Sequence, residues 1–350
     1  MKAVLLRGPK DVVIDEIPVP KISDDDVLVE VKYAGICGSD LHAYKAAKHY
    51  KPGTYLGHEY SGVLVKVGKN VRGWKVGDRI TGNPLYICGE CYACKRGRPQ
   101  QCDHVLEAPT GGAPGLRAAG AFAKFMRLPI PERRLCKLPD DVSFEEGALV
   151  ELLASGLHAV RTSDLKAGED TMVLGAGPIG LGVIAFLKYA GAGLVIATEI
   201  VKRRAEMAKK FGADYVFNPL KEPNLKQKVL DLTNGKGIDR LYTCVGTSEA
   251  FKTATDFIRH GGQVMVVDCV EEEVAIIPTL YCYNEWDMKG ALCYDYDEFP
   301  MTIEYIRKGL VPVKEMITKK IKLSDIVKDG FEVLTKPGHN EIKILVEPED

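Results

Sequence analysis

The chain carries almost no net charge, because 47 basic and 48 acidic residues give a formal value of −1. No strong electrostatic field therefore favours nucleic acid or an anionic membrane, and neither is expected as a partner. The first residues, MKAVLLRGPKDVVIDE, meet charges too early for the apolar centre of a signal peptide, so we expect a cytoplasmic protein. Internal repeats and low-complexity segments are also lacking, and an apolar content of 46% excludes a disordered or collagen-like chain.

Only one stretch, residues 172–201, is apolar enough to suggest a membrane span. Lys188 and several glycines interrupt it. A parallel sheet that is buried on both faces produces the same hydrophobic pattern. We therefore interpret the stretch as the core of a soluble domain.

The length of 350 residues exceeds the ~250–300 at which a single hydrophobic core stops growing, so two domains are expected. Short β-branched runs fill the first third, and from residue 171 strands alternate with helices, which is typical of a doubly wound parallel sheet. The fold class is thus α/β with an additional β-rich domain. Strand-like segments return near the end, so the α/β domain is expected to interrupt the other one. The expected segments are 1–154, 155–288 and 289–350.

A change to helical periodicity is expected over residues 143–163, where Ala and Leu dominate. Ser143 followed by Glu146 matches a capping box, in which the Ser and Glu side chains satisfy backbone amides at the helix start. The sequence therefore predicts a helix that begins directly after Ser143.

A glycine-rich turn lies between an expected strand, TMVL, and an apolar helix. Its six residues match G-x-G-x-x-G and run Gly175, Ala176, Gly177, Pro178, Ile179 and Gly180. The first glycine permits a tight turn, the second lets a pyrophosphate approach the backbone, and the third lets helix and strand pack closely. Amides at the helix N-terminus favour the anion. This context predicts a dinucleotide site.

An acidic residue, Glu199, closes the next strand, nineteen residues beyond the last glycine. A carboxylate there accepts hydrogen bonds from the adenosine ribose and repels a 2′-phosphate, which favours NAD over NADP. Lys202, Arg203 and Arg204 follow closely and would soften that preference, unless they are the solvated start of a helix. We include Arg204 among the cofactor-binding candidates.

Four of the ten cysteines form the motif C-x2-C-x2-C-x7-C, here called the cysteine ladder, in a basic, glycine-containing loop: Cys88, Cys91, Cys94 and Cys102. Four thiolates this close can surround a tetrahedral Zn²⁺ with no position open to substrate, so the metal would be structural. An iron–sulfur cluster is the nearest alternative, because C-x2-C-x2-C also opens the bacterial ferredoxin pattern. The fourth ligand of that pattern falls at position 98, which is Arg98 here.

A second, dispersed set of metal ligands contains Cys37, His58, Glu59 and Glu151. One thiolate, one imidazole and one or two carboxylates would form a zinc site that keeps an exchangeable position for water or substrate. Each of these residues alone is a weak signal, since a lone cysteine is more often a small core residue.

These segments together resemble the zinc-dependent medium-chain alcohol and polyol dehydrogenases over essentially the whole chain. The resemblance rests on GICGSDLH, LGHEYSG, VGDRI, the cysteine ladder, LVELLASGLHAV, VLGAGPIG and the tail ITKKIKL…DGFEVL…KILVEP. The CGSDLH motif and the ending are most similar to the (R,R)-butanediol and sorbitol dehydrogenase branch. Threonine dehydrogenase is also similar.

The resemblance implies a GroES-like catalytic domain, a Rossmann domain, NAD, about two zinc ions per chain, one catalytic and one structural, and a homodimer or homotetramer. It implies a catalytic zinc on Cys37, His58 and Glu151, with Glu59 as a direct or water-bridged alternative ligand. The polar relay of the family falls on Ser39 and His42. The implied reaction is hydride transfer between NAD and a secondary alcohol such as a vicinal diol, polyol or sugar derivative.

Two departures from the family pattern bear on the substrate. Leu152 stands where the related enzymes usually have proline, and the loop 103–121 is longer and richer in Gly and Ala than usual. Threonine, or a cyclic alcohol carried on a larger group, is the alternative substrate class. A zinc- and nucleotide-binding protein without turnover is the alternative outside enzymes, because folds outlive functions.

Overall fold

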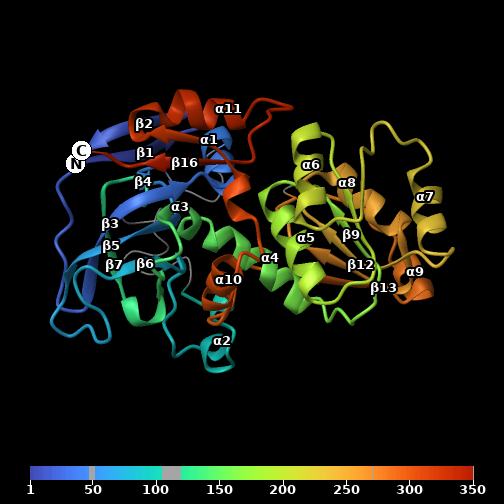
Figure 1. The fold of residues 1–350 in the computed structure, drawn as a ribbon, viewed down its shortest axis with the longest axis horizontal. Coiled ribbons are helices and arrows are strands. Elements are labelled where there is room, and N and C mark those ends of the chain that lie inside the picture. The colour runs from blue at the N-terminus through green and yellow to red at the C-terminus, as the bar shows by residue number, and fades with distance from the viewer. Residues whose placement is uncertain (47–51, 105–119, 271, 350) are drawn as a thin grey trace. The chain divides into compact units, whose positions relative to one another are not determined.

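The computed structural model describes residues 1–46, 52–104, 120–270 and 272–349. The chain divides into two compact units. Unit 1 contains Met1–Glu151 and Asp295–Asp350, and unit 2 contains Leu152–Tyr294. Both ends of the chain therefore belong to unit 1, which unit 2 interrupts in sequence (Figure 1). The two boundaries lie a few residues from the expected 154 and 289.

Unit 1 is built from two sheets. The three-stranded sheet contains β1 (Lys2–Gly8), β2 (Asp11–Glu16) and β4 (Thr54–Tyr55). The seven-stranded sheet contains β3 (Asp26–Gly35), β5 (Glu59–Val67), β6 (Arg79–Gly82), β7 (Phe125–Pro129), β8 (Leu135–Lys137), β15 (Ile317–Lys322) and β16 (Lys343–Glu347). Strand β3 is central, because it pairs with β5, β7 and β16. The last strand of the chain is thus joined to one of the first.

The helices of unit 1 are short. They are α1 (Gly38–Ala46), α2 (Tyr92–Lys95), α3 (Phe144–Gly147), α10 (Glu298–Arg307) and α11 (Glu332–Leu334). A buried cluster that includes Val29, Tyr60, Phe122 and Phe331 forms the core. Helix α1 follows directly on β3, so the loop between them lies at the end of the central strand.

Unit 2 contains a six-stranded parallel sheet in the order β11-β10-β9-β12-β13-β14. The strands are β9 (Thr171–Leu174), β10 (Val195–Thr198), β11 (Tyr215–Phe217), β12 (Ile238–Thr243), β13 (Ile258–Val266) and β14 (Asp287–Gly290). In chain order this is 3-2-1-4-5-6, the dinucleotide-binding arrangement. The predicted doubly wound sheet is therefore confirmed.

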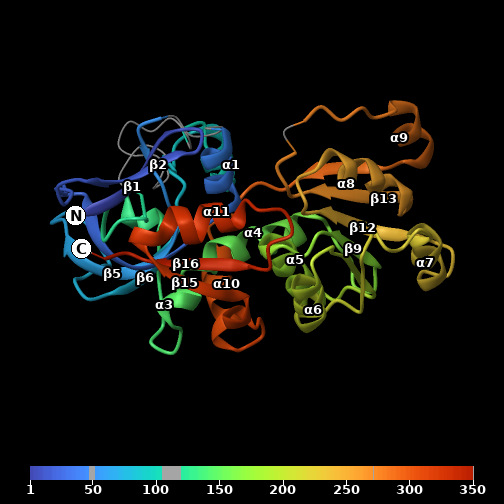
Figure 2. The ribbon, with the colours of Figure 1, turned by 90° about the horizontal axis from the view of Figure 1, so that it is seen from above.

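Helices cover both faces of this sheet. They are α4 (Val150–Thr162), α5 (Pro178–Tyr189), α6 (Lys202–Phe211), α7 (Leu225–Leu232), α8 (Ser248–Thr253) and α9 (Pro278–Asn284). Figure 2 shows α5 and α6 on one face and α8 on the other. The strands between them are buried, which explains the apolar stretch 172–201. In the described part of the chain, no helix has both the length and the apolarity that crossing a bilayer requires.

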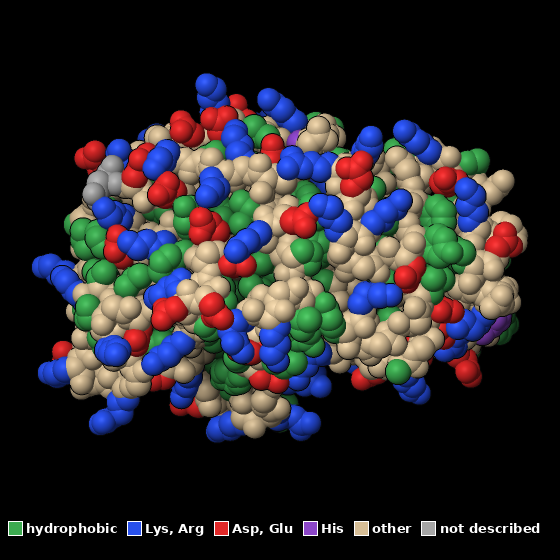
Figure 3. All heavy atoms as spheres, in the orientation of Figure 1, with side chains coloured by type: hydrophobic (Ala, Val, Ile, Leu, Met, Phe, Trp, Pro, Cys, Tyr) green, Lys and Arg blue, Asp and Glu red, His purple; other side chains and the backbone are tan. Residues whose placement is uncertain are grey.

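The capping box at Ser143 is confirmed, since Ser143 Oγ accepts from the Glu146 amide and the Glu146 carboxylate accepts from the Ser143 amide. The single helix expected over 143–163 is wrong. The chain forms α3, which ends at Gly147, and then α4, which begins at Val150. On the face drawn in Figure 3, positive and negative side chains are interspersed.

Candidate functional site

Three of the expected metal ligands meet in unit 1. The ligand atoms of Cys37, His58 and Glu59 all lie within 4.8 Å of one another. Cys37 stands between β3 and α1, while His58 and Glu59 stand at the start of β5. The antiparallel pairing of β3 with β5 places Gly35 opposite Glu59, so the two strand ends bring the three side chains together. His58 and Glu59 are buried and Cys37 is half-buried.

Asp40 connects two members of this group. Its Oδ2 accepts a hydrogen bond from the Cys37 amide at 2.9 Å, and its Oδ1 lies 3.7 Å from His58 Nδ1. Asp40 is completely buried, and burial raises the pKa of its carboxyl against the opposing charge of His58. The Nδ1 edge of the imidazole thus faces Asp40, which leaves Nε2 for a metal. Asp40 therefore closes the turn at Cys37 and places its carboxylate beside the His58 ring.

Glu59 is held by a lysine from the far end of the chain. Lys343 Nζ donates to Glu59 Oε1 at 2.8 Å and Oε2 at 2.7 Å, and also to the Ile36 carbonyl at 2.9 Å. Burial acts to lower the pKa of Lys343, but the charges of Glu59, Cys37 and Glu151 raise it above its ordinary value. A Cβ at Gly35 would stand 2.0 Å from Glu59 Oε2, so only glycine leaves room for this carboxylate.

The other expected residues lie nearby in unit 1. Ser39, in the first turn of α1, places Oγ 3.4 Å from His58 Nε2. His42 lies one turn later on the same helix and is half-buried. Glu151 is buried in the first turn of α4, and its charge acts on Lys343, but it is not a member of the three-residue group.

The four cysteines of the ladder also form one group. Their sulfurs lie within 4.8 Å of one another, with Cys88 Sγ 3.6 Å from Cys102 Sγ and 4.0 Å from Cys94 Sγ. Cys91 caps the short helix α2, and Cys102 follows a single 3₁₀ turn. Backbone amides of Cys94 and Asp103 lower the pKa of the Cys91 thiol to about 6.

Both groups fit zinc. Four sulfurs that are each ~2.3 Å from a tetrahedral ion stand roughly 3.8 Å apart, which matches the ladder. Burial raises the pKa values of the Cys94 and Cys102 thiols, so a cation is needed to hold all four as thiolates. The Cys37 group offers a thiolate, an imidazole and a carboxylate, which is a donor set of catalytic zinc sites.

The glycine turn of unit 2 has the expected backbone. Gly175 has φ of 92°, a left-handed conformation that favours glycine, and Gly177 is the N-cap of α5. A Cβ at Gly180 would stand 1.9 Å from the Gly175 carbonyl oxygen, whereas a Cβ at Gly177 would meet nothing within 4 Å. The third glycine thus permits helix packing, and the second leaves open space beside the first amides of α5, where Pro178 and Ile179 begin the helix.

Glu199 is bound to that turn. Its Oε2 accepts from the Ala176 amide at 3.1 Å, and its Oε1 accepts from the amides of Ile200 and Val201, both at 2.9 Å. Glu199, Arg204 and the glycine turn line one cavity with a volume of about 670 Å³. Burial lowers the pKa of Arg204, and the charge of Glu199 opposes that shift. The cavity has room for part of a dinucleotide.

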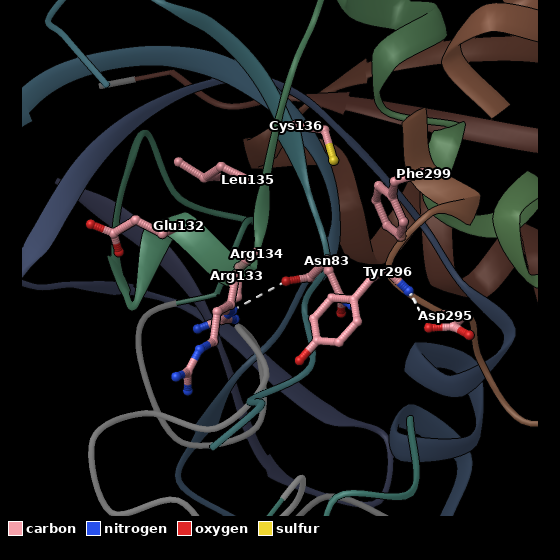
Figure 4. A pocket seen from close by; sticks show the side chains of 9 residues that line it. All are labelled: Asn83, Glu132, Arg133, Arg134, Leu135, Cys136, Asp295, Tyr296 and Phe299. Carbon is pink, nitrogen blue, oxygen red and sulfur yellow. Dashed lines mark hydrogen bonds between the residues drawn. The ribbon is translucent and has the colours of Figure 1, made fainter. Parts of the chain in front are cut away.

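A second cavity, of about 280 Å³, lies in unit 1 beside the cysteine ladder (Figure 4). Its two arginines donate hydrogen bonds to backbone carbonyls. The buried Arg134 guanidinium donates to the carbonyls of Asn83, Pro84 and Pro129, and Arg133 donates to the carbonyls of Ile87 and Cys88. The arginines of this cavity therefore hold the loop that contains the ladder.

Sequence reasoning missed Lys343, whereas Asp40 is expected from its place beside Ser39 either to orient a metal ligand or to close a turn. Lys343 lies in KILVEP, which was interpreted only as a strand, and no local signal relates it to Glu59. Of the loop 103–121, residues 105–119 lie outside the described residues. His49 and Tyr50, which precede the LGHE segment and are candidates for the substrate pocket, also lie outside them.

Comparison with known families matches both parts of the chain. The profile described as "Alcohol dehydrogenase GroES-like domain" matches residues 23–140, and "Zinc-binding dehydrogenase" matches residues 178–308. Two relatives from Bacillus subtilis match nearly the full length. Sorbitol dehydrogenase is 33% identical over 99% of this chain and 97% of its own, and (R,R)-butanediol dehydrogenase is 34% identical over 99% and 100%.

Solved structures agree with these matches. A zinc-binding dehydrogenase of Sinorhizobium meliloti bound to NADP has a TM-score of 0.89 and 29% identity, covering 99% of both chains. A dehydrogenase of Escherichia coli complexed with NADH has a TM-score of 0.88 and 26% identity, also covering 99% of both chains. Similar chains thus bind nicotinamide dinucleotides.

Proposed function

The chain belongs to the zinc-dependent alcohol and polyol dehydrogenase family, and we propose that it oxidises a secondary alcohol to the ketone with NAD⁺. The observation that carries the proposal is the group of Cys37, His58 and Glu59, whose ligand atoms lie within 4.8 Å of one another beside the Ser39 hydroxyl. Vicinal diols and polyols are the proposed substrates, because the names of the similar proteins indicate that class.

Zinc would be held by Cys37 and His58 together with a carboxylate. When bound there, Zn²⁺ supplies Lewis acidity that lowers the pKa of an alcohol hydroxyl. Because Lys343 holds both oxygens of Glu59, we assign Glu151 as the expected third ligand and Glu59 as the alternative that Lys343 restrains. The ladder Cys88, Cys91, Cys94 and Cys102 would hold the structural zinc.

The chain's own residues would remove the proton and orient the site. Ser39 Oγ would accept the proton of the alcohol while giving up its own hydroxyl proton, which His42, one turn further along α1, would pass to solvent. Asp40 keeps the His58 ring in one orientation while this happens. NAD⁺, when bound in unit 2, would supply the hydride acceptor.

We propose NAD rather than NADP as the cofactor. A buried carboxylate at Glu199 disfavours the additional phosphate of NADP. Three of the lone-pair positions of this carboxylate are already used by backbone amides, so a ribose hydroxyl would take the remaining one. Arg204 in the same cavity is the residue that would weaken the preference.

A homo-oligomer is proposed because one edge of the unit 2 sheet is open. Within the described residues, β14 pairs only with β13. Exposed apolar side chains lie on and near this edge strand: Ile276, Ile277, Leu280, Tyr283, Met288 and Leu292. Pairing with a second copy would satisfy the backbone hydrogen-bonding groups of the strand and bury these side chains.

The thiol ligands favour a reducing compartment, so we place the protein in the cytoplasm.

Replacing Cys37 by Ser tests the proposed centre. The variant is expected to lose turnover and about one zinc per chain while NADH still binds to unit 2. Cys136→Ser is the matched control, because Cys136 lies in unit 1 outside both cysteine-containing groups. Persistent turnover in Cys37→Ser would show that the metal centre is elsewhere.

A further inference from the structure

Asp268 is bonded to the turn that follows a neighbouring strand. It stands two residues after the end of β13, at Val266. Its Oδ2 accepts from the amides of Val245 at 3.1 Å and Gly246 at 2.7 Å, and its Oδ1 accepts from Thr243 Oγ1 at 2.9 Å. These three bonds fix the carboxylate between the carboxyl ends of β12 and β13.

This position belongs to one half of the dinucleotide site. In a 3-2-1-4-5-6 sheet the dinucleotide crosses the carboxyl ends of the strands at the switch point, here between β9 and β12. Glu199 marks the adenosine half at the end of β10. The nicotinamide half therefore lies over the ends of β12 and β13, where Asp268 is held, and Cys244 and Val245 already line the cavity that contains the glycine turn.

The charge of Asp268 is not neutralised by a neighbouring cation. Among the described residues, no Lys, Arg or His forms an ion pair with it, and its hydrogen-bond donors are two amides and one hydroxyl, all uncharged. The oxidised nicotinamide ring carries a positive charge, and the reduced ring is neutral. A fixed carboxylate beside the ring attracts the first form and leaves the second almost unaffected.

We propose that Asp268 makes the site prefer the oxidised dinucleotide over the reduced one. The inference rests on the proposed function, since it requires nicotinamide dinucleotides to bind unit 2. Its consequence is that the reduced product leaves more easily than it would from an uncharged site, so NADH inhibits alcohol oxidation less. Asp268 is thus a specificity residue for the redox state of the cofactor.

The test compares the binding of NAD⁺ and NADH by titration calorimetry in the full-length protein and in two variants. In Asp268→Asn the amide oxygen still accepts from Val245 and Gly246, and its NH₂ group donates to the Thr243 hydroxyl, so the turn keeps its bonds without the charge. The Kd for NAD⁺ is expected to rise about tenfold relative to that for NADH, the order expected for losing one nearby charge. Asp268→Glu keeps the charge and is expected to retain most of the preference.

A third variant, Cys269→Lys, tests the same inference if Asp268→Asn does not fold. Cys269→Lys adds a cation at an exposed position next to Asp268 and is expected to shift the ratio in the same direction. Asp287→Asn is the matched control, because this carboxylate lies at the opposite, amino end of the sheet, on β14, and binds Gln263. It should leave the ratio unchanged.

The outcomes separate the inference from the proposed function. A parallel loss of both affinities in Asp268→Asn, or an unchanged ratio, overturns the inference and assigns Asp268 to the turn alone. If the unaltered protein binds neither NAD⁺ nor NADH, the proposed function fails and the inference fails with it.

Discussion

Lys343 donates hydrogen bonds to both carboxylate oxygens of Glu59, although 284 residues separate them in the sequence. Both side chains are buried, and the positive charge of Lys343 compensates the negative charge of Glu59 beside Cys37 and His58. The last strand of the chain, β16, supplies the lysine and thereby places a cation beside the metal-binding group of unit 1.

Replacing Lys343 by Met tests this pair. The change leaves the Glu59 carboxylate buried and unpaired, so the free energy of unfolding is expected to fall by about 3–5 kcal/mol. Urea denaturation of the zinc-loaded protein measures the loss. Lys319→Met is the control, because the Lys319–Asp329 pair is partly exposed and should contribute below ~1 kcal/mol. Equal losses in both variants would contradict the role of Lys343.

The cysteine ladder predicts a bound zinc ion that stabilises the folded protein. Cys91→Ser is expected to lower the zinc content by about one ion per chain and to lower thermal stability, because a closed site of four thiolates contributes folding energy. Metal analysis and a thermal melt on the same sample measure both. An unchanged melting temperature after the loss of this zinc would show that the zinc has no structural role.

The glycine turn predicts a position-specific effect on cofactor binding. Gly180→Ala places a methyl group 1.9 Å from the Gly175 carbonyl oxygen, so the turn must move and NADH affinity is expected to fall at least tenfold, that is by over ~1.4 kcal/mol. Gly182→Ala, two residues later on α5, meets Leu153 only at 3.4 Å and should bind NADH normally. Equal affinities in the two variants would refute the packing argument.

Glu199 predicts a change in cofactor preference. Glu199→Ala removes a charge that disfavours a 2′-phosphate and also three acceptor contacts to the backbone. We expect weaker NAD⁺ binding and a higher ratio of NADP⁺ to NAD⁺ affinity, measured by titration with each cofactor. An unchanged ratio would show that Glu199 only holds the turn.

Asp239 predicts how stability changes with acid. Burial acts to raise the pKa of Asp239, but hydrogen bonds from Lys236 at 2.8 Å and Arg259 at 2.5 Å lower it below the ordinary 3.8. Because the folded pKa is depressed, the stabilisation is complete above about pH 4 and is lost as the pH falls further. Asp239→Asn should therefore be less stable than the unaltered protein at neutral pH, by about 1–3 kcal/mol. Urea titrations should show that difference shrinking below about pH 4, and a constant difference would contradict this account.

Features that depend on neighbouring residues were predictable from the sequence. The capping box at Ser143, the glycine turn at 175–180 and the clustering of the ladder are set by spacings of a few residues. The Lys343–Glu59 pair was not predictable, because it depends on β16 pairing with β3 and on the absence of a side chain at Gly35. The hydrogen bond from the Ala176 amide to Glu199 depends on the turn after β9 meeting the end of β10.

The division of the helix expected over 143–163 was not predictable from the sequence either. Helical periodicity continues through Gly147, but α3 ends there and α4 begins at Val150. The order of the segments therefore followed from sequence pattern, whereas the exact ends of elements and the partners of charged groups followed from packing.

The most direct test of the account is NADH formation by the zinc-loaded protein. The substrate panel contains vicinal diols, polyols, threonine and cyclic alcohols, each with NAD⁺, and Cys37→Ser is measured beside the unaltered protein. We predict that a secondary diol or polyol gives NADH and that Cys37→Ser gives none. Binding of NADH without turnover on any alcohol would contradict the account and would favour a zinc- and nucleotide-binding protein that is not an enzyme.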